Sequence, residues 1–209
     1  MVKFFHQYAR KLCLIIIVLL FSTSLWQFAT ASWIQGKAVI AQQLLNHSWK
    51  QTVNNSQINN FQDSKIENSI HKPWPWADTW PVAKLIAPQH NIEQIVLAGD
   101  NGSSLAFGPG HSFASATPNT SGLTMISGHR DTHFNFLQEL KLNDIIYVQT
   151  ADKIVQYRIY DFKIVDSKTF TLASSSDEHI LVLVTCYPFD AIRPGGSLRY
   201  LVYANKQVI

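Results

Sequence analysis

The chain has 209 residues, is nearly half apolar and carries a formal net charge of +3. This length fits one globular domain with appendages, and the composition is that of a protein with a core of ordinary size. The small positive charge, with no basic patch interleaved with aromatic residues, argues against nucleic-acid binding.

The N-terminal region combines a short basic segment with a long apolar run. Residues 1–11 contain three basic side chains, and residues 12–34 contain no charge. A membrane-spanning helix needs about 20 apolar residues, so the run is long enough to span. Basic segments stay in the cytoplasm, so we predict a single-pass anchor in the cytoplasmic (inner) membrane, with the N-terminus inside and the rest periplasmic or extracytoplasmic. A cleaved signal peptide ending near Ala29-Thr30-Ala31 is the alternative, and it exports the domain equally.

Residues 35–73 are predicted to hold a juxtamembrane helix and a polar linker. Ala38 to Trp49 has apolar residues at helical spacing. Gln51 to Ser69 is rich in Asn, Gln and Ser, which predicts a polar linker or a loose surface helix. The pattern leaves open whether residues 51–73 cover a functional site.

Residues 74–209 form the predicted folded domain, and their pattern is mostly strand-like. Short runs rich in Val, Ile, Leu and Tyr alternate with Gly-, Pro- and Asn-containing turns. Only Asn135–Leu140 is typical of a brief helix. Eight short strands with so little helical spacing favour a closed or nearly closed antiparallel barrel. The predicted strands are Val82–Ala87, Ile92–Ala98, Ser104–Phe107, Leu123–Ser127, Asp144–Thr150, Ile154–Val165, Ile180–Thr185 and Leu198–Tyr203.

Reactive side chains concentrate in three strings, SGHRDTHF, LVTCYPFDA and PGGSLRY, which contain His129, Cys186 and Arg199 respectively. A thiol at a strand end is held rigidly and still reaches solvent, and an imidazole is its usual acid or base partner. A guanidinium offers forked donors to a developing oxyanion. Cys186 and Arg199 lie 13 residues apart across one turn, so adjacent antiparallel strands would bring them together.

Other residues near these three side chains are predicted to be solvated or structural rather than reactive. Arg193 lies in a loop and is typical of a solvated side chain, whereas Arg199 lies inside an apolar strand, where a guanidinium needs a partner or a task. His133 is predicted to be structural. Arg130 and Asp131 are predicted to pair with each other or with neighbours and hold the loop. The His129–His133 spacing would suit a metal pair, but no Glu or third ligand accompanies it.

Together the three strings resemble the active-site segments of sortases, specifically the small class found in Gram-negative bacteria. The family nucleophile closes a T-L-x-T-C signature, and here Val182 replaces the first Thr while Leu183 and Thr185 are retained. The resemblance covers residue 74 to the C-terminus. It implies Cys186 as nucleophile, His129 as acid and base, and Arg199 as the oxyanion- or substrate-stabilising group.

The resemblance also implies a fold and a reaction. The fold would be all-β, a sortase-like closed eight-stranded barrel with short helices, preceded by the transmembrane helix. The reaction would be cleavage of an LPxTG-like C-terminal sorting signal of an exported protein between Thr and Gly, through a Cys thioester, with transfer to an amine acceptor. Thr185, Val184 and Gly128 would line the substrate site.

Two alternatives stay open at this stage. A thiol peptidase would use the same Cys, His and Arg site with water as the acceptor, and a peptide-binding barrel would have no need of all three residues. Some sortases use calcium near the loop that corresponds to residues 166–179. Asp177 and Glu178 are too few acidic residues for such a site, so we predict no metal and no cofactor.

Overall fold

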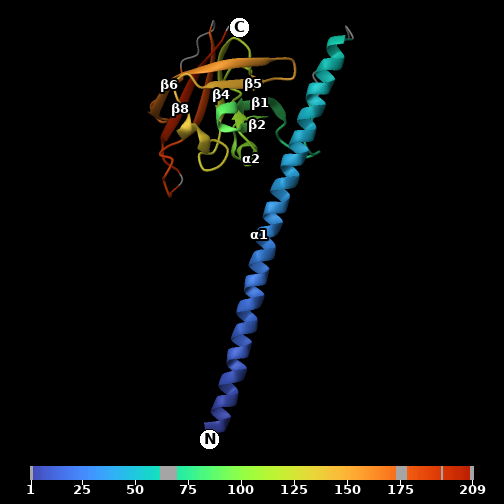
Figure 1. The fold of residues 1–209 in the computed structure, drawn as a ribbon, viewed down its shortest axis with the longest axis vertical. Helices are drawn as coiled ribbons and strands as arrows, with labels where there is room; N and C mark the ends of the chain where they lie inside the picture. Colours follow the sequence, from blue (N-terminus) through green and yellow to red (C-terminus); the bar gives the residue numbers. More distant parts are fainter. Residues whose placement is uncertain (1, 62–69, 173–177, 194, 208–209) are drawn as a thin grey trace. The chain divides into compact units, whose positions relative to one another are not determined.

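The computed structural model describes residues 2–61, 70–172, 178–193 and 195–207 (Figure 1). The chain separates into two units, Met1–Gln42 and Gln43–Ile209. The first unit is helical throughout its described part, and the second contains all the strands.

Helix α1 (Val2–Phe61) contains the whole predicted apolar run. Large apolar side chains from Leu14 to Trp33 point to the surroundings rather than into a core. Among the described residues, α1 is the one helix long and apolar enough to cross a membrane, judged by length and composition. The helix continues through residues 51–61, so this part of the predicted linker takes the surface-helix alternative, while residues 62–69 lie outside the described residues.

The C-terminal part of α1 belongs to the barrel unit. Leu45 and Trp49 are buried against Ile95 and Leu97 of a barrel strand, and Val53 packs at the edge of the same cluster. Burial of large apolar side chains stabilises such contacts by about 1.5–3 kcal/mol each. These contacts lie within the compact unit that begins at Gln43.

In the part of the chain that the structure describes, eight strands form the barrel, and seven of them begin and end within three residues of the predicted runs. The sheet closes in the order β1-β2-β3-β4-β7-β8-β6-β5. The strands are β1 (Pro81–Ala87), β2 (Ile92–Ala98), β3 (Gly110–His111), β4 (Gly122–Ser127), β5 (Ile145–Gln149), β6 (Ile154–Asp166), β7 (His179–Cys186) and β8 (Leu198–Lys206). Figure 1 shows the long strands β6 and β8 in orange and red, which pair along most of their length.

Closure of the barrel confirms the predicted fold, but the pairing is not wholly antiparallel. Strands β2 and β3 are parallel, and so are β4 and β7. The connection from β4 to β7 runs through η2 (Asn135–Glu139), β5 and β6, which is long enough for a parallel crossover. This parallel pair has a functional consequence, because both strands end at the same edge of the sheet.

One predicted strand is wrong. Ser104–Phe107 was expected to be extended, but α2 (Gly102–Leu105) is a short helix there. The side chain of Asn101 accepts a hydrogen bond from the backbone N–H of Ser104 at 3.0 Å, which caps the first turn. The eighth strand is β3 instead, and a further turn of 3-10 helix, η1 (Pro88–His90), joins β1 to β2.

The barrel interior is filled by apolar side chains that alternate along the strands. Strand β1 shows the alternation most clearly, with every second residue from Pro81 to Ala87 buried. The helix η2 closes the core with Phe136 and Leu137. Phe134, which directly precedes η2, is fully buried and packs edge-to-face with Phe136 at 6.0 Å between ring centroids. This packing holds the segment after β4, where the predicted histidine lies.

Candidate active site

Cys186 and Arg199 are directly opposite each other on neighbouring strands. Strands β7 and β8 pair antiparallel in a register that matches Cys186 with Arg199. Both side chains are half-buried at the end of the ladder. The Arg199 Nη1 atom donates to the carbonyls of Gly196 at 2.7 Å and Leu198 at 2.9 Å, which fixes the guanidinium beside its own turn. The predicted proximity of these two residues is therefore present.

His129 follows the end of β4, next to the end of β7. The parallel register matches Ser127 with Val184, and the backbone N–H of Gly128 donates to the Val184 carbonyl at 3.0 Å. The Thr185 hydroxyl then donates to the Gly128 carbonyl at 2.7 Å. His129 is the next residue and is exposed. The sheet thus places the segments that contain His129 and Cys186 at one edge.

Gly128 is required by close packing rather than by an unusual backbone angle. A Cβ atom at this position would lie 2.6 Å from Cγ of Phe134, inside normal contact distance. The Phe134 backbone N–H also donates to the His129 carbonyl at 2.9 Å, which closes the turn. The buried ring and this hydrogen bond together fix the path of the chain on both sides of His129.

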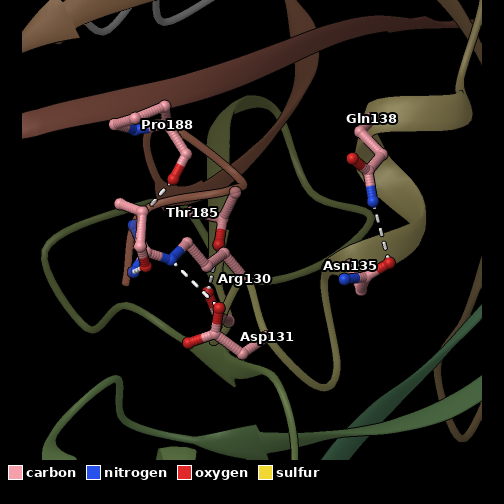
Figure 2. Close-up of polar contacts among 8 residues, drawn as sticks. Arg130, Asp131, Asn135, Gln138, Thr185 and Pro188 are labelled. Carbon is pink, nitrogen blue, oxygen red and sulfur yellow. Dashed lines mark hydrogen bonds and ion pairs between the residues drawn. The ribbon is translucent and has the colours of Figure 1, made fainter. Parts of the chain in front are cut away.

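Arg130 is buried and joins two loops (Figure 2). Its Nη1 and Nη2 atoms donate to the carbonyls of Pro188 and Ala191, each at 2.7 Å, and its Nε atom donates to Asp131 at 3.1 Å. Pro188 and Ala191 belong to the loop that follows Cys186. The predicted pairing of Arg130 with Asp131 is confirmed. Sequence reasoning missed the two carbonyl partners, because nothing in the sequence pattern indicates them.

His133 is half-buried, as expected for a structural residue. Its carbonyl accepts a hydrogen bond from Gln94 Nε2 at 2.7 Å. Burial lowers the pKa of His133, and the nearby charge of His129 lowers this pKa further.

No group of three or more His, Cys, Asp or Glu side chains in the described ranges is arranged to hold an ion. Asp177, one of the two acidic residues predicted to be too few for a calcium site, lies outside the described residues. Arg193, the alternative to Arg199, is exposed in the loop between β7 and β8.

Of the predicted substrate-site residues, Val184 is half-buried, whereas Gly128 and Thr185 are buried. The Thr185 side chain is 2% exposed, and its hydroxyl donates a hydrogen bond to the Gly128 carbonyl.

Sequence reasoning missed an aromatic cluster beside these residues. Tyr187 stacks on Tyr200 with 6.2 Å between ring centroids, and Phe189 meets Tyr200 edge-to-face at 5.3 Å. These three rings form an aromatic cluster whose members lie close to Cys186 and Arg199 in the sequence.

Comparison with known proteins identifies the family. A family model described as the Sortase domain matches residues 85–207. The chain belongs to the sortase family. Sortase D of Bacillus subtilis (strain 168) is 32% identical over 120 residues, which cover 57% of this chain and 60% of that protein. The match thus spans less than two thirds of this curated relative.

Solved structures agree with the barrel. Sortase A from Corynebacterium diphtheriae superposes with a TM-score of 0.57 at 26% identity, over 64% of this chain and 64% of that one. A Clostridium perfringens Sortase D5 transpeptidase has a TM-score of 0.61 at 21% identity and covers 81% of this chain and 99% of that one, which supports the fold. These relatives are Gram-positive sortases, so the likeness to the Gram-negative class stays a prediction.

Proposed function

We propose that this sortase is a cysteine transpeptidase that uses Cys186 as nucleophile, His129 as acid and base, and Arg199 to stabilise the oxyanion. The observation that carries the proposal is the cross-strand pairing of Cys186 with Arg199, at the sheet edge where β4 delivers His129. Family membership supports the same assignment. The assignment within the family to the class found in Gram-negative bacteria is part of the proposal.

The reaction has two halves. The Cys186 thiolate attacks the carbonyl carbon of the scissile peptide bond, and Arg199 with nearby backbone N–H groups stabilises the tetrahedral oxyanion. The C–N bond then breaks, His129 gives its proton to the leaving amine, and a Cys186 thioester remains. An incoming amine, deprotonated by His129, attacks the thioester. The thiolate leaves, and a new peptide bond forms.

The proposed substrate is an exported protein with an LPxTG-like C-terminal sorting signal, cleaved between Thr and Gly. We place the signal beside Val184 and Gly128, at the edge where β4 and β7 end. Thr185 contributes through its hydrogen bond to Gly128, because its side chain is buried. The aromatic cluster of Tyr187, Phe189 and Tyr200 would border the signal at the same edge.

The proposed location follows from α1. The apolar part of the helix would anchor the protein in the cytoplasmic membrane, with the basic N-terminus inside and the barrel on the extracytoplasmic side. This location would place Cys186 where exported substrates emerge. Proteinase accessibility of the barrel in intact cells, compared with lysed cells, tests the orientation.

Product analysis tests the reaction. The full-length chain in detergent micelles is mixed with an LPxTG-type peptide and an excess of glycine or hydroxylamine, with Cys186→Ala as control. Mass spectrometry is expected to find cleavage after Thr with the amine attached, and no cleavage by the variant. Cleavage with only water added would instead assign a thiol peptidase to the same three residues.

A further inference from the structure

Arg130 occupies a special place between the two segments of the proposed site. It directly follows His129, yet its side chain points away from solvent and is 7% exposed. Each of its three guanidinium nitrogens has an acceptor within the chain: Asp131 and Pro188, which Figure 2 labels, and Ala191. This use of the guanidinium differs from that of Arg199, which lies half-buried at the sheet edge.

The partners of Arg130 continue a series of links between β4 and β7. The sheet ends with the Gly128–Val184 backbone hydrogen bond, and the Thr185 hydroxyl adds a bond to Gly128. Beyond this point the two segments leave the sheet, one with His129 and one just past Cys186. The two hydrogen bonds from Arg130 are the next links between them.

The contacts of Arg130 also shape the loop after Cys186. The Pro188 carbonyl accepts from Arg130 and from the backbone N–H of Ala191, so the guanidinium fastens a turn that is already closed. Two carbonyls and the exposed Asp131 carboxylate replace the water that a buried guanidinium loses. A buried charge of this kind is a poor way to gain stability compared with an apolar side chain of similar size. Its advantage is a fixed geometry, because the planar fork sets two acceptor positions at once.

We propose that Arg130 is a positioning residue, which ties the His129 segment to the loop after Cys186 and thereby holds the imidazole facing the thiol. The inference rests on the proposed function, since it assigns His129 and Cys186 as a working pair. It does not require that the peptide substrate be known. Arg130 acts through His129 and does not touch the reacting atoms.

A double-mutant cycle on thiol reactivity tests the coupling. The rate of Cys186 alkylation by iodoacetamide is measured near pH 7 in full-length chain in detergent, with the adduct located by peptide mass. The four chains are the unmodified protein, His129→Ala, Arg130→Ala and the double variant. Arg130→Ala is expected to slow alkylation about tenfold in the unmodified background and by less than about twofold when His129 is absent. Equal slowing in both backgrounds, or none, would overturn the proposal.

Control and rescue variants separate positioning from folding. Arg158→Ala is the matched control, because Arg158 is exposed on β6 and donates to Gln207 at 3.0 Å. It should leave the rate unchanged. Guanidinium ion at tens of millimolar is expected to restore most of the rate of Arg130→Ala and none of that of His129→Ala. If Arg130→Ala loses its fold, Arg130→Lys replaces it in the cycle. The lysine ammonium cannot reach both carbonyls, so we expect Cys186 alkylation to slow about threefold, and only when His129 is present. An unchanged alkylation rate would overturn the proposal.

Peptide turnover distinguishes this inference from the proposed function. If the alkylation rates show the expected dependence of Arg130→Ala on His129 but no peptide product forms, the transpeptidase assignment is refuted and the positioning role stands. Peptide turnover by Arg130→Ala at the rate of the unmodified protein would refute the positioning role and leave the transpeptidase standing.

Discussion

Gly128→Ala is expected to impair catalysis far more than its size suggests. The added Cβ would lie 2.6 to 2.9 Å from three atoms of the Phe134 ring. Carbon atoms in contact prefer about 3.5–4.0 Å, so ring and backbone must separate by about 1 Å. The ring is fully buried and packed against Phe136, which leaves the backbone beside His129 to move.

The size of the effect follows from this displacement. Overpacking a core by one methyl group costs about 1–3 kcal/mol. Displacing a catalytic group by about 1 Å costs about a hundredfold in rate. We therefore expect urea unfolding of Gly128→Ala to show a loss of about 2 kcal/mol. We expect kcat/KM for an LPxTG-type peptide to fall about a hundredfold.

A second substitution tests the cause. Phe134→Leu removes the ring atoms that the new Cβ would meet, so adding it to Gly128→Ala should recover about tenfold of the lost activity. Gly102→Ala is the matched control, because its Cβ would meet nothing within 4 Å. Activity of Gly128→Ala within threefold of the unmodified protein would refute the argument, as would a double variant no better than the single one.

Three further predictions concern stability. Tyr157→Phe removes the hydrogen bond to Asn119 at 3.2 Å and should cost about 1–2 kcal/mol in urea unfolding; an unchanged midpoint would contradict this. Because the pKa of His133 is lowered in the folded protein, the imidazole becomes protonated at a higher pH in the unfolded chain than in the folded one. Native stability is therefore lost as pH falls below 6.5, and His133→Gln should reduce this loss in thermal melts between about pH 7 and 5; equal slopes would count against it. Trp49→Ala should destabilise the barrel by about 3 kcal/mol in urea unfolding, because Trp49 is buried against Ile95. An unchanged unfolding midpoint would show that α1 contributes nothing to the stability of the barrel.

The fold was largely predictable because burial dictates strand composition. Seven runs of β-branched and aromatic residues became strands near the predicted bounds. The failure at Ser104 came from capping, since Asn101 stabilises a helical turn that strand propensity does not register. Strand β3 is two residues long and offers no periodicity to detect. Pairing partners are also invisible in a strand pattern, which is why the parallel β4–β7 pair was not anticipated.

The pairing of Cys186 with Arg199 was predictable from the sequence, whereas the contacts that support the candidate site were not. Cys186 and Arg199 are separated by one turn, so their antiparallel pairing followed from sequence spacing. The contacts of Arg130 with Pro188 and Ala191 join residues 58 and 61 positions apart, and no local pattern reports such contacts. The packing of Phe134 on Gly128 was missed for a different reason, because a glycine in sequence does not reveal which side chain fills the space beside it.

Intact-mass measurement of the acyl-enzyme tests the central assignment most directly. The full-length chain is quenched in acid seconds after mixing with an LPxTG-type peptide, without added amine, and the adduct is located by peptide mass. We expect a mass increase equal to the peptide up to and including Thr, attached at Cys186, sensitive to hydroxylamine and absent in Cys186→Ala. Cleaved peptide that accumulates with no adduct at Cys186, or an adduct that persists in Cys186→Ala, would contradict the assignment.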